Sequence, residues 1–515
     1  MRKAIVAILA ICLLAVTATA QSNTGRLVGT VSDPSGVVPG ASVVVRDNLS
    51  GREKTIVSSD DGSFTVEQLD PGTYTVTITA AGHKTFSAPD VKIDIGREYS
   101  LNPTLEVGNI SETVEVTAGT DIVNSSNGEL SSTVSPRQIL ELPINGRNPL
   151  ALLNLQPGVN ATSSSINGQR SSSANYTRDG INVQDNFIRT GGFVQDRPTV
   201  DDTGEFTVVT QNASADQGGG GSTQVQLFTP RGGADFHGGF WEYNRNSKFA
   251  ANEFFNNSAG IARPFLNRNQ FGAKLSGPVA LPRFGEGGPA VRRGKAFFFA
   301  QYERFELRQQ ASIQRSVLRA AARTGEFTYT DNSGATRTVN VLTGAGLTGA
   351  IPAAAGGVLG VDPIIQRRLL DIMPGVGNAA VSNNNLTQLL LLNQSDNDTR
   401  NAFTGRFDVD FSDRNSLNFV YKYNDNADQR QSDAGGFGVN PFVFQGGPTK
   451  FYVATYRTTL GASFVNEVRG GYTSSEPFFN NNSIPSDFII GGLPLGLSSP
   501  EASFEAQGRN TKQYT

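Results

Sequence analysis

Residues 403–411 read FTGRFDVDF, with apolar or small side chains alternating with polar ones along the whole stretch. The alternation returns at residues 417–423, where Leu417 and Phe419 share one parity, and again at residues 452–464. Successive side chains of a β-strand point to opposite faces of its sheet, so each segment predicts a strand with one apolar and one polar face. Both a soluble sandwich with one wet face and a membrane barrel with a polar lumen fit this pattern.

The composition favours strands and disfavours several classes of site. The chain has 515 residues, a formal net charge of −3, 57 Gly, 24 Pro and 32 Phe. This length suggests about three domains of roughly 150 residues each, and turn residues mixed with aromatics suit strands better than helical bundles. The near-neutral net charge argues against nucleic-acid binding, which needs a basic face. Two His and one Cys offer little for a metal or haem centre.

The N-terminus predicts a secretory signal peptide over residues 1–20. Two basic residues precede an apolar run at residues 4–16, and small side chains follow as far as Ala20. This order is typical of export signals, and we expect cleavage between Ala20 and Gln21. The run is shorter than the about 20 residues of a membrane-spanning helix. Cys12 is the sole cysteine and lies within the run, so the exported chain would have no disulfide framework.

Residues 24–107 read as short strands separated by turn residues. Tyr74, Val76 and Ile78 share one face of a segment whose other face carries threonines. Turn signals such as Asp-Pro-Gly at residues 70–72 recur at short intervals. This spacing predicts a small antiparallel sandwich of about 80 residues.

Four segments of this region resemble the carboxypeptidase regulatory-like domain family. They are GTVSD at 29–33, PGA at 39–41, DGSF at 61–64 and LDPGTY at 69–74. The resemblance implies a transthyretin-like or carbohydrate-binding-like β-sandwich. It implies no peptidase activity, because neither His83 nor His237 has the His-x-x-Glu spacing of a zinc carboxypeptidase. A folded spacer and a glycan-binding module both remain open as roles for this domain.

Residues 108–233 mix short helices with strands. Ser135 followed by Pro136 predicts a capped helix start, and PLALLNL at 149–155 predicts a second short helix. EFTVV at 205–209 predicts a strand. The pattern indicates a mixed α/β domain.

A pair of acids and a run of glycines in the same region resemble parts of functional sites but lack the residues that would complete one. Asp201 and Asp202 are adjacent acids without a partner base, which indicates a solvated turn. Residues 218–221 are four glycines, but no Lys-Ser or Lys-Thr of a phosphate loop follows them. We therefore expect a flexible or tightly turning segment there, and no Ser/His/Asp set elsewhere suggests a hydrolase.

Four segments resemble the plug domain of TonB-dependent outer-membrane receptors, and specifically the Oar-like group, which carries an N-terminal regulatory-like domain. They are ELPINGRN at 141–148, LQPGV at 155–159, NGQR at 167–170 and DGIN at 179–182. Together with the export signal, this resemblance favours the membrane barrel for the C-terminal strands. FTPRGG at 228–233 departs from the Thr-Lys/Arg-Ser-Gly arrangement that relatives show where the plug joins the barrel.

Residues 112–117 read ETVEVT and predict a short strand where such receptors carry their TonB box. The resemblance implies that these residues pair edge to edge with a strand of the energising protein TonB. They are Glu112, Thr113, Val114, Glu115, Val116 and Thr117. An ordinary first strand of the plug is the alternative, and the sequence leaves both open.

Residues 234–515 contain the barrel-like strands. FHGGFWEY at 236–243, NQFG at 269–272, FFFAQYE at 297–303 and VNEVRGGY at 465–472 also resemble strands of the Oar-like group. Residues 307–401 lack sustained alternation and predict an extracellular loop region with short helices. We count seven to nine candidate strands, whereas the family's barrel has about 22. The chain is therefore expected to contain an incomplete antiparallel transmembrane barrel and to be an N-terminal fragment.

The sequence thus predicts a mainly β protein with four parts: a signal peptide at 1–20, a β-sandwich at 24–107, a plug at 108–233 and part of a barrel at 234–515. The resemblance implies a TonB-dependent importer in the outer membrane of a Gram-negative cell, taking up a ligand too large for porins. Its expected partners are TonB with its inner-membrane complex, outer-membrane lipid and an unidentified extracellular ligand. We assign no enzymatic activity, cofactor or metal. A structural or adhesion protein of the same fold is the alternative.

Overall fold

The computed structural model describes most of the chain from residue 24 onward. The described residues are 24–115, 128–160, 165–185, 195–213, 217, 221, 223–258, 260–282, 291–292, 294–346, 360–361, 363, 366, 375, 377, 386–412, 414–429, 443–460, 464–481, 507–508 and 511–514. The predicted signal peptide with Ala20 and Gln21 lies outside the described residues. Of the four glycines at residues 218–221, only Gly221 is described.

The N-terminal part is a two-sheet sandwich. One sheet has the order β6-β1-β9 and the other β10-β8-β7-β4-β5. The strands are β1 (Gly25–Thr30), β4 (Ser42–Asp47), β5 (Glu53–Val57), β6 (Ser63–Leu69), β7 (Gly72–Thr79), β8 (Thr85–Ile93), β9 (Glu98–Ser100) and β10 (Thr113–Glu115), with a small hairpin of β2 (Ser32–Asp33) and β3 (Gly36–Val37). Tyr74, Val76 and Ile78 are buried in the core between the sheets, which confirms the predicted parity of this strand.

The second part is a five-stranded sheet with short helices, which agrees with the mixed α/β pattern of residues 108–233. We refer to it as the plug, after the domain that the sequence predicts there. Its order is β11-β14-β15-β12-β13. The elements are β11 (Leu130–Val134), α2 (Pro136–Glu141), η1 (Pro149–Leu155), η2 (Ser171–Ser173), β12 (Asn175–Arg178), β13 (Ile181–Asn182), β14 (Glu205–Gln211) and β15 (Gln224–Phe228). Ser135 caps α2 and forms a capping box with Gln138, which confirms the predicted helix start.

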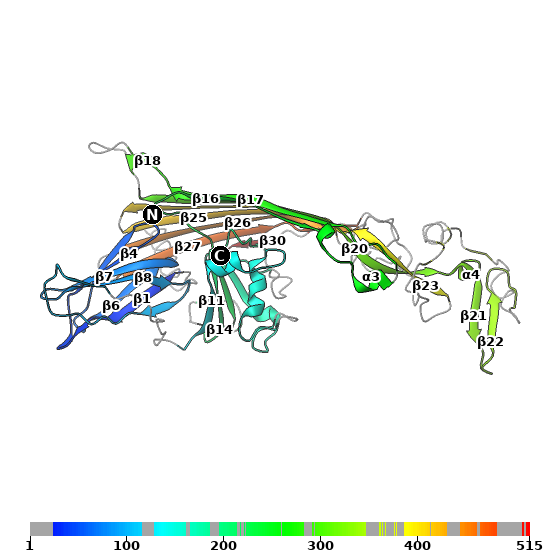
Figure 1. The fold of residues 1–515 in the computed structure, drawn as a ribbon, viewed down its shortest axis with the longest axis horizontal. Helices are drawn as coiled ribbons and strands as arrows, with labels where there is room; N and C mark the ends of the chain where they lie inside the picture. The colour runs from blue at the N-terminus through cyan, green and yellow to red at the C-terminus, as the bar shows by residue number, and fades with distance from the viewer. Residues whose placement is uncertain are drawn as a thin grey trace, which may run out of the picture.

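The third part is a large antiparallel sheet whose central path is β16-β17-β20-β24-β25-β26-β27-β30. These strands are β16 (His237–Asn246), β17 (Leu266–Pro278), β20 (Ala296–Leu318), β24 (Asp398–Ser412), β25 (Asn415–Gln429), β26 (Val443–Leu460), β27 (Phe464–Ser475) and β30 (Thr511–Tyr514). β23 (Thr387–Ser395), β28 (Phe478–Asn481) and β29 (Gln507–Gly508) pair beside this path. The described strands form a curved sheet that does not close on itself (Figure 1).

The two faces of this sheet differ as the alternation predicts. Thr404 and Lys422 lie on the inner face and are buried, whereas Phe403 and Phe419 remain about two-fifths exposed. A row of ring contacts crosses the outer face of neighbouring strands, with centroid separations of 6.0 Å for Phe403–Tyr421, 4.9 Å for Tyr421–Tyr452 and 6.2 Å for Tyr452–Tyr472. An apolar outer face with aromatic rows suits contact with lipid. None of the helices among the described residues is long and apolar enough to cross a membrane.

The expected loop region at residues 307–401 is partly wrong. β20 runs on to Leu318, and β23 pairs with this extension, while β24 already begins at Asp398. A hairpin of β21 (Glu326–Thr330) and β22 (Thr336–Asn340) follows the short helix α4 (Ala320–Arg323). Since a tilted strand needs only about 9–11 residues to cross a membrane, much of the 23-residue β20 projects beyond it. Alternation is weak there because most side chains of residues 307–316 are half-buried or exposed, and neither face is consistently buried.

The sandwich and the plug lie side by side on the same face of the large sheet (Figure 1). The arm formed by β20 and β23 extends away from them and ends at the β21–β22 hairpin. The face on which the plug lies is the polar inner face described above. The same part of the chain also contains the strand pair of β18 (Leu281–Pro282) and β19 (Val291–Arg292) and the two short helices η3 (Ser247–Phe249) and α3 (Phe254–Ser258).

Candidate functional site

A tight turn places the central charges of the plug. Asp179 and Gly180 join β12 to β13 as a two-residue hairpin loop, and both have positive φ, 47° and 79°. An Asp-Gly pair suits this turn because Gly, and to a lesser degree Asp, tolerates positive φ. The turn sets Arg178 at the end of β12, and the Asp179 carboxylate accepts hydrogen bonds from Thr229 N (3.0 Å) and Thr229 Oγ1 (2.6 Å).

A buried charge network joins the plug to the inner face of the sheet. Arg178 pairs with Asp196 and Asp202, and Lys422 of β25 pairs with the same two carboxylates. The Lys422 Nζ to Asp202 Oδ2 distance is 2.8 Å, and all four side chains are at most 1% exposed. Burial alone would raise the pKa of Asp202, but Lys422 and Arg178 outweigh it and hold that pKa below its usual value.

The prediction of a solvated turn at Asp201 and Asp202 is therefore wrong. Asp202 is fully buried in the network, and Asp201 pairs with Arg147 (2.8 Å) and with Lys274 of β17 (2.7 Å). The partner cations come from other elements, and the lysines stand on barrel strands far along the sequence. The residues next to Asp201 and Asp202 in the sequence therefore carry no sign of these partner cations.

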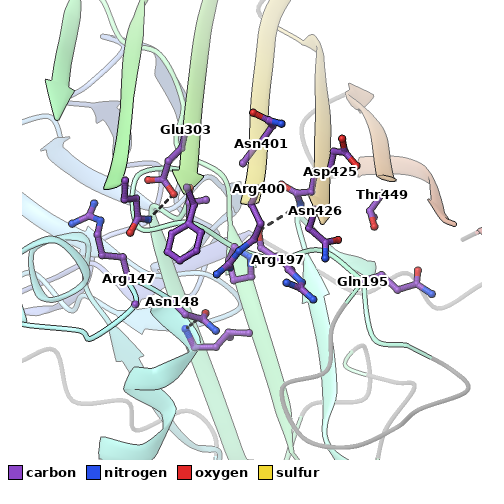
Figure 2. Close-up of a pocket in the computed structure, with 18 residues that line it drawn as sticks. Arg147, Asn148, Gln195, Arg197, Glu303, Arg400, Asn401, Asp425, Asn426 and Thr449 are labelled. Carbon is purple, nitrogen blue, oxygen red and sulfur yellow. Dashed lines mark hydrogen bonds between the residues drawn. The ribbon is translucent and has the colours of Figure 1, made fainter. Parts of the chain in front are cut away.

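A cavity of about 270 Å³ lies between the plug and the sheet. Figure 2 shows Arg147 and Arg197 of the plug and Arg400 of β24 around it. The Arg400 guanidinium lies 4.1 Å from the centroid of the Phe305 ring. The buried side-chain amide of Gln195 also lines the cavity, and its Nε2 and Oε1 atoms make no hydrogen bond within the described part of the chain. A polar lining with unsatisfied groups suits binding of a polar ligand.

One wall of this cavity carries a buried acid. Glu303 of β20 accepts hydrogen bonds from Gln270 Nε2 (2.8 Å) and Trp241 Nε1 (3.2 Å). No sequence motif predicts this set, since its members lie on three different strands, β16, β17 and β20.

The sandwich is attached to both neighbouring parts by buried charges. Arg231 pairs with Asp47 (2.6 Å) and Asp70 (3.6 Å), while Arg457 of β26 reaches Asp70 from the sheet (2.7 Å). Burial would raise the pKa of Asp70, but Arg457, Arg231 and Arg406 together hold it well below its usual value. Arg231 belongs to the segment 228–233 that departs from the relatives' pattern, and here it ties that junction to the sandwich.

A protonatable contact joins the sandwich to the plug. Glu205 of β14 is buried and accepts a hydrogen bond from Ile95 N (2.9 Å). Burial, with a smaller effect from Asp94, raises the pKa of Glu205 from 4.5 to about 7. The charged form is therefore disfavoured at this contact.

This shift predicts a pH dependence. A folded-state pKa raised to about 7 means that the contribution of Glu205 is complete below its ordinary value of 4.5 and is lost as the pH rises through 7. We expect the amide of Ile95 to exchange hydrogen faster above neutral pH in the native chain than in a Glu205→Gln variant measured at the same pH. A ratio of the two rates that stays constant from about pH 5 to 8 would show that Glu205 does not titrate there.

The segment predicted as a TonB box is only partly described. Thr113, Val114 and Glu115 form β10, which pairs in parallel with β8 of the sandwich, and Glu112 directly precedes it. Val116 and Thr117 lie outside the described residues. Within the described strands the plug sheet ends at β11 and does not include β10, so these three residues pair with the sandwich and not with the plug. Whether the segment binds TonB stays a prediction.

The two histidines have ordinary surroundings. His83 Nε2 lies 3.0 Å from Asp33 Oδ2, and this hydrogen bond raises the pKa of His83. His237 is the exposed first residue of β16 and pairs with Ser276. Neither belongs to a group of three possible ligand residues among the described part of the chain.

Comparisons with known proteins agree with this architecture. The Carboxypeptidase regulatory-like domain family matches residues 26–106, and the Outer membrane beta barrel domain family matches residues 228–511. The chain is 24% identical over 279 residues to the TonB-dependent transporter Oar of Myxococcus xanthus, which covers 51% of this chain and 26% of that protein. The chain thus spans about a quarter of the length of this curated relative.

Solved structures give weaker likenesses. The outer membrane transporter YddB from Escherichia coli has 12% identity and a TM-score of 0.42, covering 75% of this chain and 44% of that one. The siderophore receptor PirA from Pseudomonas aeruginosa has 13% identity and a TM-score of 0.31, covering 75% and 51%. The family match, in contrast, spans more than half of the chain, contains the strands from β16 to β29 and ends at the first residue of β30. The chain belongs to the Outer membrane beta barrel domain family and is a protein of the Gram-negative outer membrane.

Proposed function

We propose that this protein is a TonB-dependent transporter that imports a ligand too large for porins. The ligand binds from outside, TonB pulls on the segment at the start of the plug, and the plug shifts to open a path. No covalent bond is broken in this cycle, and no cofactor takes part. The parts are a signal peptide at 1–20, a sandwich at 24–107, a plug at 108–233 and barrel strands from 234 onward.

The observation that carries this proposal is the position of the plug. Its sheet lies on the polar face of the barrel strands and is held there by the buried network of Arg178, Asp196, Asp202 and Lys422. A plug fixed by a small number of charge pairs can be held firmly at rest and still be displaced when force is applied. The cavity between plug and sheet is the place where we expect the ligand to lie.

Three surfaces of the molecule are expected to meet different partners. The aromatic outer face of the sheet contacts lipid. Arg147, Arg197 and Gln195 line the cavity from the plug side and would contact the extracellular ligand. The TonB-box-like residues Glu112–Thr117 would meet TonB and its inner-membrane complex.

Deletion of residues 110–117 tests this function. We expect the variant to bind ligand at the cell surface as the full-length protein does, but to lose uptake, because the energising partner can no longer pull on the plug. Uptake of a labelled ligand should fall to the level of cells treated with a protonophore. Energised uptake that survives the deletion would contradict the assignment of this segment.

A structural or adhesion role is the second candidate. The observation that favours it is the arm of β20 and β23 with the β21–β22 hairpin, which extends well away from the plug (Figure 1). Surface adhesion without any uptake dependent on the proton-motive force would favour this role over transport.

A further inference from the structure

The sandwich is docked on the inner face of the barrel strands through two of its turns. Arg52, which directly precedes β5, lies 2.7 Å from a carboxylate oxygen of Asp410 on β24, and its guanidinium lies 5.1 Å from the centroid of the Phe297 ring on β20. Asp70, which directly follows β6, pairs with Arg457 on β26 at 2.7 Å. The sandwich therefore contacts three strands of the large sheet.

The register of the sheet places these contacts near one end of the strands. Ser416 on β25 pairs with both Asp410 and Arg457, so these two residues lie at one level of the sheet. Close to this level the chain passes from β24, which ends at Ser412, to β25, which begins at Asn415. Such short connections are typical of the periplasmic side of bacterial barrels. We therefore expect the sandwich to lie at the periplasmic end.

The plug contacts the same face at another level. Thr404 on β24 donates to the Asp202 carboxylate (3.1 Å) and pairs in register with Lys422, which also contacts that carboxylate. At about 3.3 Å per residue, Thr404 and Asp410 are about 20 Å apart along β24. Figure 1 accordingly shows the sandwich, the plug and the arm in this order along the strands. The sandwich thus lies on the periplasmic side of the plug.

The sandwich also packs against the plug itself. Ile95 N donates to Glu205 on β14 (2.9 Å). The backbone of Gly96 approaches β15 so closely that a Cβ atom there would lie 2.5 Å from Gln226 Oε1. The sandwich is therefore in contact with both the barrel strands and the plug sheet.

We propose that the sandwich is a second closure of the barrel, a gate below the plug that has to leave the barrel strands before a large solute can pass. The inference rests on the proposed function, in which the plug moves. The ion pairs of Arg52 and Asp70 with the barrel strands form the latch of this gate. Undocking leaves partners on both sides, since Arg457 also pairs with Glu467 (2.6 Å) and Asp70 also pairs with Arg231 (3.6 Å). Because a buried charge without a partner is costly, these second partners make the latch reversible.

Two closures in series predict that both have to be loosened before a large solute enters. The probe is fluorescently labelled vancomycin, which is too large for porins, and its entry into cells is measured at equal amounts of the assembled protein. Lys422→Met loosens the plug, and Arg52→Met together with Asp70→Asn opens the latch. The matched control for the latch is Arg46→Met with Glu53→Gln, an ion pair of the same sandwich whose side chains are 61% and 56% exposed.

We expect entry at the native level in the plug variant, in the latch variant and in the plug variant with the control pair. Only the combined plug and latch variant should admit more vancomycin, by about fivefold or more, because the two substitutions act on coupled closures. Equal entry in Lys422→Met with and without the latch substitutions would overturn the gate, since the sandwich would then block nothing.

Native-level entry in the combined variant would overturn the gate as well, because two loosened closures must leave a path. Hydrogen exchange of the amides of β14 and β15 in the same variant verifies that the plug is loosened. Neither result affects the proposed function, because vancomycin entry needs no energising partner and the deletion of residues 110–117 tests energised uptake separately.

Discussion

Replacing Lys422 with methionine is expected to destabilise the plug by about 3–5 kcal/mol, the usual cost of removing one partner of a buried ion pair. Lys422 touches both Asp196 and Asp202, and without it only Arg178 remains to balance two fully buried carboxylates. The measurement is hydrogen exchange of the amides of β14 and β15 in the folded barrel, which should become faster as the plug opens more often.

Lys274 provides the matched control. It is also a barrel lysine that pairs with a plug aspartate, Asp201 (2.7 Å), but its side chain is 32% exposed. Asp201 also keeps Arg147 as a partner. We therefore expect Lys274→Met to cost no more than about 1 kcal/mol. Equal effects of the two substitutions would contradict the view that the buried network holds the plug.

Replacing Arg231 with methionine is expected to loosen the contact between the sandwich and the junction segment at residues 228–233. Arg231 pairs with Asp47 (2.6 Å) and donates to the Pro71 carbonyl (3.2 Å), so its loss leaves the Asp47 carboxylate buried without a cation. The expected cost is about 3–5 kcal/mol. Asp70 keeps Arg457, which limits the damage to one side of the contact.

The amide of Ala234 reports this release directly. It donates to the Leu49 carbonyl across the contact (2.9 Å), so its hydrogen exchange should accelerate in Arg231→Met. Arg46→Met is the control: it lies next to Asp47 on β4, but its side chain is 61% exposed and its ion pair with Glu53 spans 3.8 Å. Unchanged exchange at Ala234 in Arg231→Met would show that other contacts hold the sandwich in place.

The mainly β architecture was predictable because it depends on local periodicity. A strand with one apolar face needs a period of two, and residues 403–411 display it without reference to any partner. The same holds for Tyr74, Val76 and Ile78 in the sandwich. The Asp-Gly turn at 179–180 and the Ser135 cap are equally local, since φ preference and side-chain reach act within a few residues.

The candidate site was far less predictable. Asp201 and Asp202 carried no signal of their partners, because an ion pair depends on distance in space and Lys422 belongs to another domain. The length of β20 was also missed, since neither face of its projecting part is consistently buried and its sequence therefore shows no alternation. The segment at 112–117 predicted a strand but could not indicate which edge it would join.

By itself, the sequence determined where most strands form and which face of each is apolar, and it predicted an export signal and a resemblance to a plugged barrel. Only the tertiary structure decided which charges meet: Lys422 with Asp202, Arg231 with Asp47, and Glu205 with the amide of Ile95. It also decided that β10 joins β8 of the sandwich. The physical reason is that hydrophobic periodicity is written into consecutive residues, whereas strand neighbours and buried ion pairs arise only when separate elements pack together.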